Sequence, residues 1–285
     1  MSSTIRLFAD DLIIYREISS ENSHNLLQND INVLFDWSQR WLMKFNSKKC
    51  NMVLLSKSKS LNKPNYKLGN DNLLYIDSFT YLGITISSTL NWSEHVNSVY
   101  FKATRALNFI TRNLSICDTK HKSLAYTSIV RPHLEYAAAS WDPYQKNHIA
   151  LLNKVPNRAA RFCFNDYGYT SSVSGLIKQL GWTSLEVRST SRLAELYKII
   201  NGLSPIDGGD MLNKSCQNNR GNSFGTSFIN LSLRIDCFKF SFFPRTIRDW
   251  NKLSPHLRSS PNLVSFKNLI SSQSLEDVLK WSDIS

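Results

Sequence analysis

Two adjacent carboxylates, Asp10 and Asp11, lie between apolar runs at the start of this 285-residue chain. Ile5 to Leu7 precede them and Leu12 to Tyr15 follow, so the pattern predicts a strand, a tight turn with both acids, and a second strand. Carboxylate oxygens are ligands that Mg²⁺ prefers, together with water and substrate phosphates. The turn is therefore a candidate metal site. The alternative is a turn cap without metal, which is commoner for a lone acidic pair.

A basic segment lies downstream of the acidic pair. The chain has a formal net charge of +12, and between Asp36 and Asp71 it carries eight basic residues and no acid. This clustering is typical of a nucleic-acid contact surface, since neutralising phosphates releases counterions. A solvated basic loop without a ligand is the alternative. The candidate contacts in this segment are Arg40, Lys44, Lys48, Lys57 and Lys59.

The sequence indicates no other kind of site. The five cysteines form no C-x-x-C pair, and the six histidines lie apart from ligand clusters, so we expect no zinc site and place the histidines at the surface or at caps. No glycine-rich phosphate loop or Ser/His/Asp arrangement occurs. Without a leader-like segment or an apolar run of about 18 residues, the protein is expected to be intracellular, cytoplasmic or nuclear, and not membrane-bound.

The elements that position the acids are mixed α and β. After the first hairpin, apolar residues recur at helical spacing and predict a helix at 20–44. Short apolar runs between turn residues predict strands at 52–55, 66–68, 73–76 and 80–86.

The remainder of the chain is predicted to be mainly helical. Helices are expected at 92–112, after a cap at Asp118, from Arg131-Pro132, and at 145–164 with an interruption or kink at Pro156. Further helices are predicted at 172–180 and 184–201, followed by a Gly/Ser/Asn-rich loop at 202–226. Alternation predicts strands at 228–243, and a short amphipathic helix at 244–253 follows.

Several short motifs follow one another in a definite order. They are Phe8-Ala9-Asp10-Asp11, Asn46 to Cys50, Tyr81-Leu82-Gly83, Arg131 to Tyr136 with Trp141, Arg158 to Arg161, Leu180-Gly181-Trp182, and Phe242 to Thr246 with Trp250-Asn251. This order resembles the carboxy-terminal half of the reverse transcriptases of non-LTR retrotransposons, particularly the jockey-like and related animal lineages. The resemblance covers nearly the whole chain. In that family the first three motifs are palm motifs C, D and E.

The resemblance implies an α+β fold in three parts. Residues 1–88 would be an α/β palm remnant with motifs C, D and E, and residues 89–165 a helical thumb-like domain. Residues 166–285 would form a helical carboxy-terminal region, with the 202–226 loop and a short strand-rich segment.

The resemblance also implies RNA-directed DNA polymerase chemistry, which is nucleotidyl transfer assisted by Mg²⁺ or Mn²⁺ on an RNA or DNA template with a primer. Asp10 and Asp11 would bind the metal ions. Lys49 would protonate the leaving pyrophosphate, and one more solvated lysine is its alternative. The primer end would be braced by Tyr81, Leu82 and Gly83, or these are simply buried strand residues.

Phosphate contacts are also predicted on the helix at 96–112. Its face opposite the apolar stripe carries Lys102, Arg105 and Arg112, as in a polymerase thumb. Tryptophans can stack on bases, but we expect core packing for most of the six considered: Trp37, Trp41, Trp92, Trp141, Trp182 and Trp250.

The family's third catalytic aspartate, in motif A, and motif B would lie upstream of Asp10, where only nine residues precede. We therefore expect the isolated chain to lack polymerase activity, as a fragment of a retrotransposon polymerase. The alternatives are a non-catalytic nucleic-acid-binding remnant and a structural remnant without activity. A palm sheet without its motif A strand should expose an edge and apolar surface, which predicts self-association.

Overall fold

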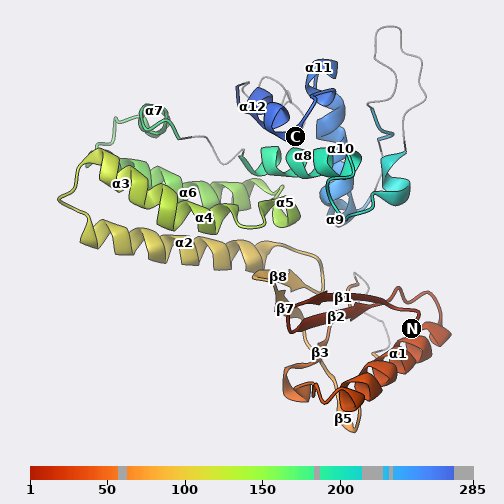
Figure 1. Ribbon diagram of the computed structural model, residues 1–285. Coiled ribbons are helices and arrows are strands. Elements are labelled where there is room, and N and C mark those ends of the chain that lie inside the picture. The colour runs from red at the N-terminus through yellow and green to blue at the C-terminus, as the bar shows by residue number, and fades with distance from the viewer. Residues whose placement is uncertain (57–62, 183–186, 214–226, 231–233, 273–285) are drawn as a thin grey trace. The chain divides into compact units, whose positions relative to one another are not determined.

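The computed structural model describes residues 1–56, 63–182, 187–213, 227–230 and 234–272. The chain divides into two compact units, Met1–Asn91 and Trp92–Ser285. Each unit has its own secondary-structure elements (Figure 1). The three-part division at 88 and 165 stays a prediction, although the border between the units lies close to its first boundary.

The first unit combines one long helix with four separate two-stranded pairings. The pairings are β1 with β2, β4 with β5 and β7 with β8, all antiparallel, and β3 with β6, which is parallel. The elements are β1 (Thr4–Phe8), β2 (Asp11–Tyr15), α1 (Glu21–Arg40), the 3₁₀ helix η1 (Ser47–Lys49), β3 (Asn51–Met52), β4 (Lys67–Leu68), β5 (Asp71–Asn72), β6 (Leu74–Tyr75), β7 (Ser78–Tyr81) and β8 (Ile84–Ser87).

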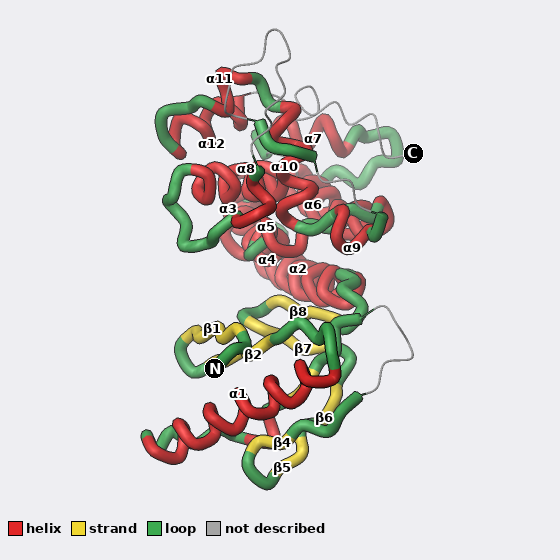
Figure 2. Tube along the Cα trace, turned by 90° about the vertical axis from the view of Figure 1, so that its right-hand side faces the viewer, coloured by secondary structure: helices red, strands yellow, loops and turns green. Residues whose placement is uncertain are grey.

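Helix α1 forms the core of the first unit with the short strands that lie along it (Figure 2). Its residues Leu27 and Ile31 are buried at helical spacing, as predicted, against Tyr66, Leu68 and Leu73. The helix ends at Arg40, four residues before the predicted end. The strand predicted at 80–86 is wrong, because this segment is the β7–β8 hairpin, which turns back at Leu82 and Gly83.

The second unit is helical throughout its regular elements in the part that the structure describes. These elements are α2 (Ser93–Asn113), α3 (Thr119–Ala125), the π-helical turn η2 (Tyr126–Val130), α4 (Arg131–Glu135), α5 (Ala138–Trp141), α6 (Lys146–Phe164), α7 (Val173–Gln179), α8 (Val187–Ile200), the 3₁₀ helix η3 (Gly209–Leu212), α9 (Asp236–Lys239), α10 (Phe242–Lys252), α11 (Pro255–Arg258) and α12 (Leu263–Ser272).

Most of the helices predicted from the sequence are confirmed. Asp118 caps α3 by accepting a hydrogen bond from the His121 backbone N–H. α4 begins at Arg131 with Pro132 in its first turn, as predicted, and it follows α3 without a break through the π turn. The interruption predicted at Pro156 is not observed, since α6 runs from Lys146 to Phe164.

The carboxy-terminal helices have a core of their own. Leu193 and Leu196 of α8 pack with Ile247 and Trp250 of α10 and with Phe266 of α12. The strands predicted at 228–243 are wrong. The described residues of this segment contain α9 and the start of α10, and residues 231–233 lie outside them. In so short an aromatic-rich run, apolar alternation does not distinguish a strand from a helix. Residues 214–226 of the predicted loop lie outside the described residues.

In the described parts of the chain, every helix is too short or too polar to cross a bilayer.

Candidate metal and nucleic-acid sites

The acidic pair lies at the tip of the β1–β2 hairpin, as the sequence predicts. Ala9 and Asp10 form the turn, Phe8 pairs with Asp11, and both carboxylates are exposed. Ala9 has a φ of 50°, a left-handed conformation that is unfavourable for a residue with a Cβ. The strained turn therefore holds two carboxylates next to each other in solvent.

These two carboxylates can supply part of the ligand shell of one hard cation. Oxygen donors suit Mg²⁺, which keeps several waters and often binds one or two protein carboxylates together with substrate phosphates. Among the described residues, no group of three His, Cys, Asp or Glu side chains comes together to hold a metal ion. The hairpin thus supplies two ligands, and a site for two ions requires additional ones.

A buried aspartate on α1 anchors the start of the hairpin. The Asp30 carboxylate accepts hydrogen bonds from the backbone N–H groups of Ser2 and Ser3, the latter at 2.7 Å, and lies 3.7 Å from an Arg16 guanidinium nitrogen. Burial raises its pKa, but the hydrogen bonds from Ser3 and Ser2 outweigh this effect and hold the pKa below its ordinary value. No local sequence pattern predicts this contact between residues 27 and 28 positions apart.

The hairpin also has free edges. Within the described chain, β1 and β2 pair only with each other. Leu7 is 70% exposed, Phe8 60% and Tyr15 48%. The exposed edge and apolar surface expected of this segment are present, while self-association stays a prediction.

The other predicted catalytic residues are not joined to the acidic pair. Lys49 is exposed in η1, and no hydrogen bond or ion pair between described residues links it to Asp10 or Asp11. Tyr81 ends β7, and Leu82 and Gly83 form its turn, with φ angles of 48° and 79°. Leu82 is therefore a turn residue and not a strand residue.

Exposed basic residues lie along α2 and α6, two helices that pack side by side. Their alignment is parallel, because Ser93 bonds His148 near the helix starts and Arg158 donates to Asn108 at 3.1 Å further along. Lys102, Arg105 and Arg112 are exposed on α2, as predicted. We call the exposed basic residues of both helices the α2–α6 face: Lys102, Arg105, Arg112, Lys146, Lys154 and Arg158.

The α2–α6 face carries almost no negative charge. After Glu94, neither helix has an acid. The α6 residues were not predicted as contacts, although the sequence of α6 contains no Asp or Glu. Phe101 and Phe109 are 60% and 54% exposed on α2, so the face also presents aromatic rings. Phosphate contacts and base or sugar packing are both available here.

The basic segment of the first unit is also exposed where it is described. Arg40, Lys44 and Lys48 face solvent, whereas Lys57 and Lys59 lie outside the described residues. The expectation of core packing holds for Trp141, Trp182 and Trp250, which are at most 9% exposed. It is wrong for Trp37 and Trp41, which are 43% and 64% exposed. Both lie at the carboxyl end of α1, where the described residues leave the helix partly open to solvent.

Two histidines predicted to be at the surface are buried. His95 lies edge-on against Trp141, with ring centroids 4.7 Å apart. Burial, assisted by the positive charge of Lys102, lowers the pKa of His95 to about 4. Burial also lowers the pKa of His148. Both are neutral core residues at neutral pH, and nothing in their spacing distinguishes them from surface histidines.

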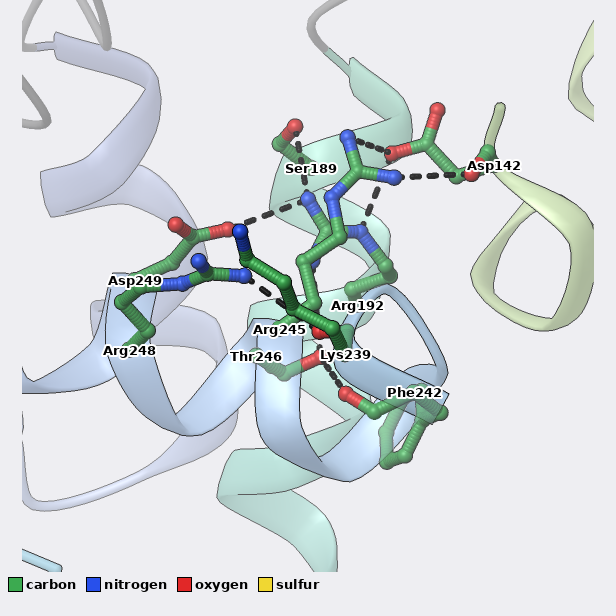
Figure 3. A network of polar contacts seen from close by, with 9 residues as sticks. All are labelled: Asp142, Ser189, Arg192, Lys239, Phe242, Arg245, Thr246, Arg248 and Asp249. Carbon is green, nitrogen blue, oxygen red and sulfur yellow. Dashed lines mark hydrogen bonds and ion pairs between the residues drawn. The ribbon is translucent and has the colours of Figure 1, made fainter. Parts of the chain in front are cut away.

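A buried ionic network joins three helical elements of the second unit (Figure 3). The Arg192 guanidinium of α8 donates to Asp142 after α5 at 3.0 Å and to Asp249 of α10 at 3.1 Å. Arg245 of α10 bonds the Asp142 backbone carbonyl at 2.7 Å. Burial and the neighbouring Arg192 lower the pKa of Arg245 to about 10. The network is structural, because its charged groups bind one another.

Two curated retrotransposon proteins match the chain over about two thirds of its length. The first is a retrovirus-related Pol polyprotein from type-1 retrotransposable element R1 2 of Nasonia vitripennis, 23% identical over 216 residues, covering 69% of this chain and 50% of the relative. The second is a probable RNA-directed DNA polymerase from transposon BS of Drosophila melanogaster, 24% identical over 196 residues, covering 66% of this chain and 22% of the relative.

The chain resembles non-LTR retrotransposon polymerases. The resemblance given by the ordered motifs is thereby confirmed. The chain spans half the length of the R1 relative and about a fifth of the BS relative. No family model matches the chain. No solved structure matches it either.

Proposed function

We propose that this chain is the carboxy-terminal part of an RNA-directed DNA polymerase of a non-LTR retrotransposon and that it binds primer–template nucleic acid. The observation that carries the proposal is the α2–α6 face, a cationic and nearly acid-free surface in a chain similar to such polymerases. Under this proposal the first unit corresponds to a palm segment and the helices from α2 to α6 to a thumb.

The Asp10-Asp11 turn would hold Mg²⁺ or Mn²⁺ in the complete enzyme. A divalent ion there would supply charge neutralisation during nucleotidyl transfer. The part played by this chain is to present two exposed carboxylates on a short hairpin whose start is anchored by Asp30. Lys49 and the Tyr81 to Gly83 turn are the proposed triphosphate and primer contacts.

We infer that this chain alone does not extend a primer. Two carboxylates are too few for a site that holds two ions, and the described residues supply no third ligand nearby. The chain is therefore proposed to act by binding nucleic acid and to require additional polymerase segments for catalysis.

The test is primer extension by the purified chain on an oligonucleotide-primed RNA template with Mg²⁺ or Mn²⁺. We expect no incorporation above that of the Asp10→Asn variant. Mn²⁺ titration monitored by electron paramagnetic resonance should detect weak binding by the parent chain and weaker binding by Asp10→Asn. Incorporation that depends on Asp10 would contradict inactivity, and equal Mn²⁺ binding by both chains would contradict the metal site.

The second candidate function, nucleic-acid binding without any metal role, has a specific observation in its favour. The cationic face lies on helices of the second unit, whereas the carboxylates belong to the first unit. If Mn²⁺ binding does not depend on Asp10 while primer–template binding is retained, this second function is the correct one.

A further inference from the structure

The carboxyl end of α1 carries two exposed tryptophans, Trp37 in its last turn and Trp41 as the C-cap residue. Trp37 and Trp41 are 43% and 64% exposed. They are four residues apart, a spacing that puts neighbouring side chains on one side of a helix with Cβ atoms about 5–6 Å apart. Large aromatic rings normally contribute to cores and interfaces, so a pair left in solvent is unusual.

The backbone after Trp41 fixes this arrangement. The Met43 N–H donates to the Ser38 carbonyl at 3.0 Å and the Leu42 N–H to the Gln39 carbonyl at 3.3 Å, which is the hydrogen-bond pattern of a Schellman motif. Leu42 occupies the left-handed position, with a φ of 56°, where glycine is usual. Trp41 is therefore held at a closed helix end and does not lie on a frayed segment.

Three exposed cations lie close to the two tryptophans in the sequence. Arg40, Lys44 and Lys48 are exposed, and none of them takes part in an ion pair between described residues. The nearest acid in the sequence, Asp36, is rotated by about 100° from Trp37 around the helix. The surface thus combines two aromatic rings with excess positive charge.

We propose that Trp37 and Trp41, with Arg40, Lys44 and Lys48, form a platform for single-stranded nucleic acid. Bases stack on the indole rings and the basic side chains contact the phosphates. A duplex fits less well, because its bases are already stacked and their faces are hidden. A second copy of the chain is also disfavoured, because pairing this surface with itself would bring like charges together.

This inference rests on the proposed function only in taking nucleic acid as the ligand. The platform is in the first unit, and it uses neither the Asp10-Asp11 turn nor the α2–α6 face. Within the complete enzyme, its ligand would be the unpaired part of a template.

Fluorescence anisotropy with a labelled twelve-nucleotide oligo(dT) and oligo(U) tests the platform in the full chain at low salt. Trp37→Ala and Trp41→Ala should each weaken binding by about five-fold to 150-fold, the range found for loss of base–aromatic stacking. Trp41→Phe should bind within a few-fold of the parent chain, whereas Trp41→Leu, which keeps an apolar side chain, should bind as weakly as Trp41→Ala.

Leu42→Ala is the matched control, since Leu42 is 84% exposed, apolar and adjacent. It should leave oligonucleotide binding unchanged. Thermal melts monitored by circular dichroism serve as the folding control. Trp41→Ala and Leu42→Ala should melt close to the parent chain, whereas Trp37→Ala should melt somewhat lower, because more than half of the Trp37 side chain is buried.

Three results would overturn the platform: no oligonucleotide binding by the parent chain, tryptophan variants that bind like the parent, or a Trp41→Leu variant that binds like the parent. Sedimentation that shows a dimer lost in Trp41→Ala, with oligonucleotide binding unchanged, would assign the surface to a second copy. The proposed function fails separately, because it requires primer–template binding that depends on Lys102, Arg105 and Arg112.

Discussion

Replacing His95 should remove much of the acid sensitivity of the second unit. His95 is 3% exposed, and its ring lies edge-on against Trp141. Its pKa falls from 6.5 to about 4 on folding, first because of burial and second because of Lys102. A histidine whose pKa is lowered in the folded state destabilises that state as the pH falls, since the unfolded chain binds the proton more tightly.

The size of the effect follows from those two pKa values. Its contribution to stability is fully present above pH 6.5 and is lost as the pH falls toward 4. Between about pH 7.5 and pH 4.5 the loss is about 2.5 kcal/mol for this one residue. His95→Phe keeps an aromatic ring against Trp141 and cannot titrate, so its stability should fall by about 2.5 kcal/mol less over the same interval.

Urea unfolding followed by circular dichroism at both pH values measures this difference. The comparison between the two chains cancels the titration of carboxylates that both contain. Exposed His133 offers a matched control, and His133→Phe should lose stability in parallel with the parent chain. Parallel loss in the parent chain and in His95→Phe would show that His95 binds a proton equally well in the folded and unfolded states, which would refute the reasoning.

Three other substitutions test local features of the fold by denaturant unfolding. Leu42→Gly should raise the free energy of unfolding by about 0.5–1 kcal/mol, because glycine tolerates the φ of 56° and little buried surface is lost; a destabilised variant would contradict the assigned helix end. Gly69→Ala should cost about 1–3 kcal/mol, since Gly69 has a φ of 61° and an added Cβ would lie 2.6 Å from the Phe35 ring; an unchanged midpoint would count against this packing. Arg192→Met should cost about 3–5 kcal/mol by leaving the buried Asp142 with fewer partners, and a neutral result would mean that the network is solvated.

Local signals predicted much of the helical part of the fold. The apolar stripe of α2 and the cap at Asp118 both follow from rules that act within a few residues. The same is true of the acidic hairpin, where two apolar runs flank a turn. The candidate metal pair could therefore be located from the sequence alone.

Features that depend on distant residues could not be predicted. The network of Arg192 with Asp142 and Asp249 joins residues about 50 positions apart, and an isolated sequence does not show which charges pair. The exposure of Trp41 depends on where α1 ends and on what covers it, and hydrophobicity alone favours burial. The strand prediction at 80–86 was wrong for a local reason. Leu82 occupies a left-handed turn position, but leucine is a residue type expected in a strand and not in such a turn.

Primer–template binding as a function of salt is the most direct test of the proposed function. The logarithm of the parent chain's affinity should fall linearly with the logarithm of salt concentration. Each duplex phosphate contact contributes about 0.9 to the magnitude of this slope. Substituting Lys102, Arg105 and Arg112 with glutamine should therefore reduce the magnitude by about 2–3, and Asp10→Asn should leave it unchanged. No binding at low salt, or an unaltered slope in the triple variant, would contradict the proposal that this chain uses the α2–α6 face to hold nucleic acid.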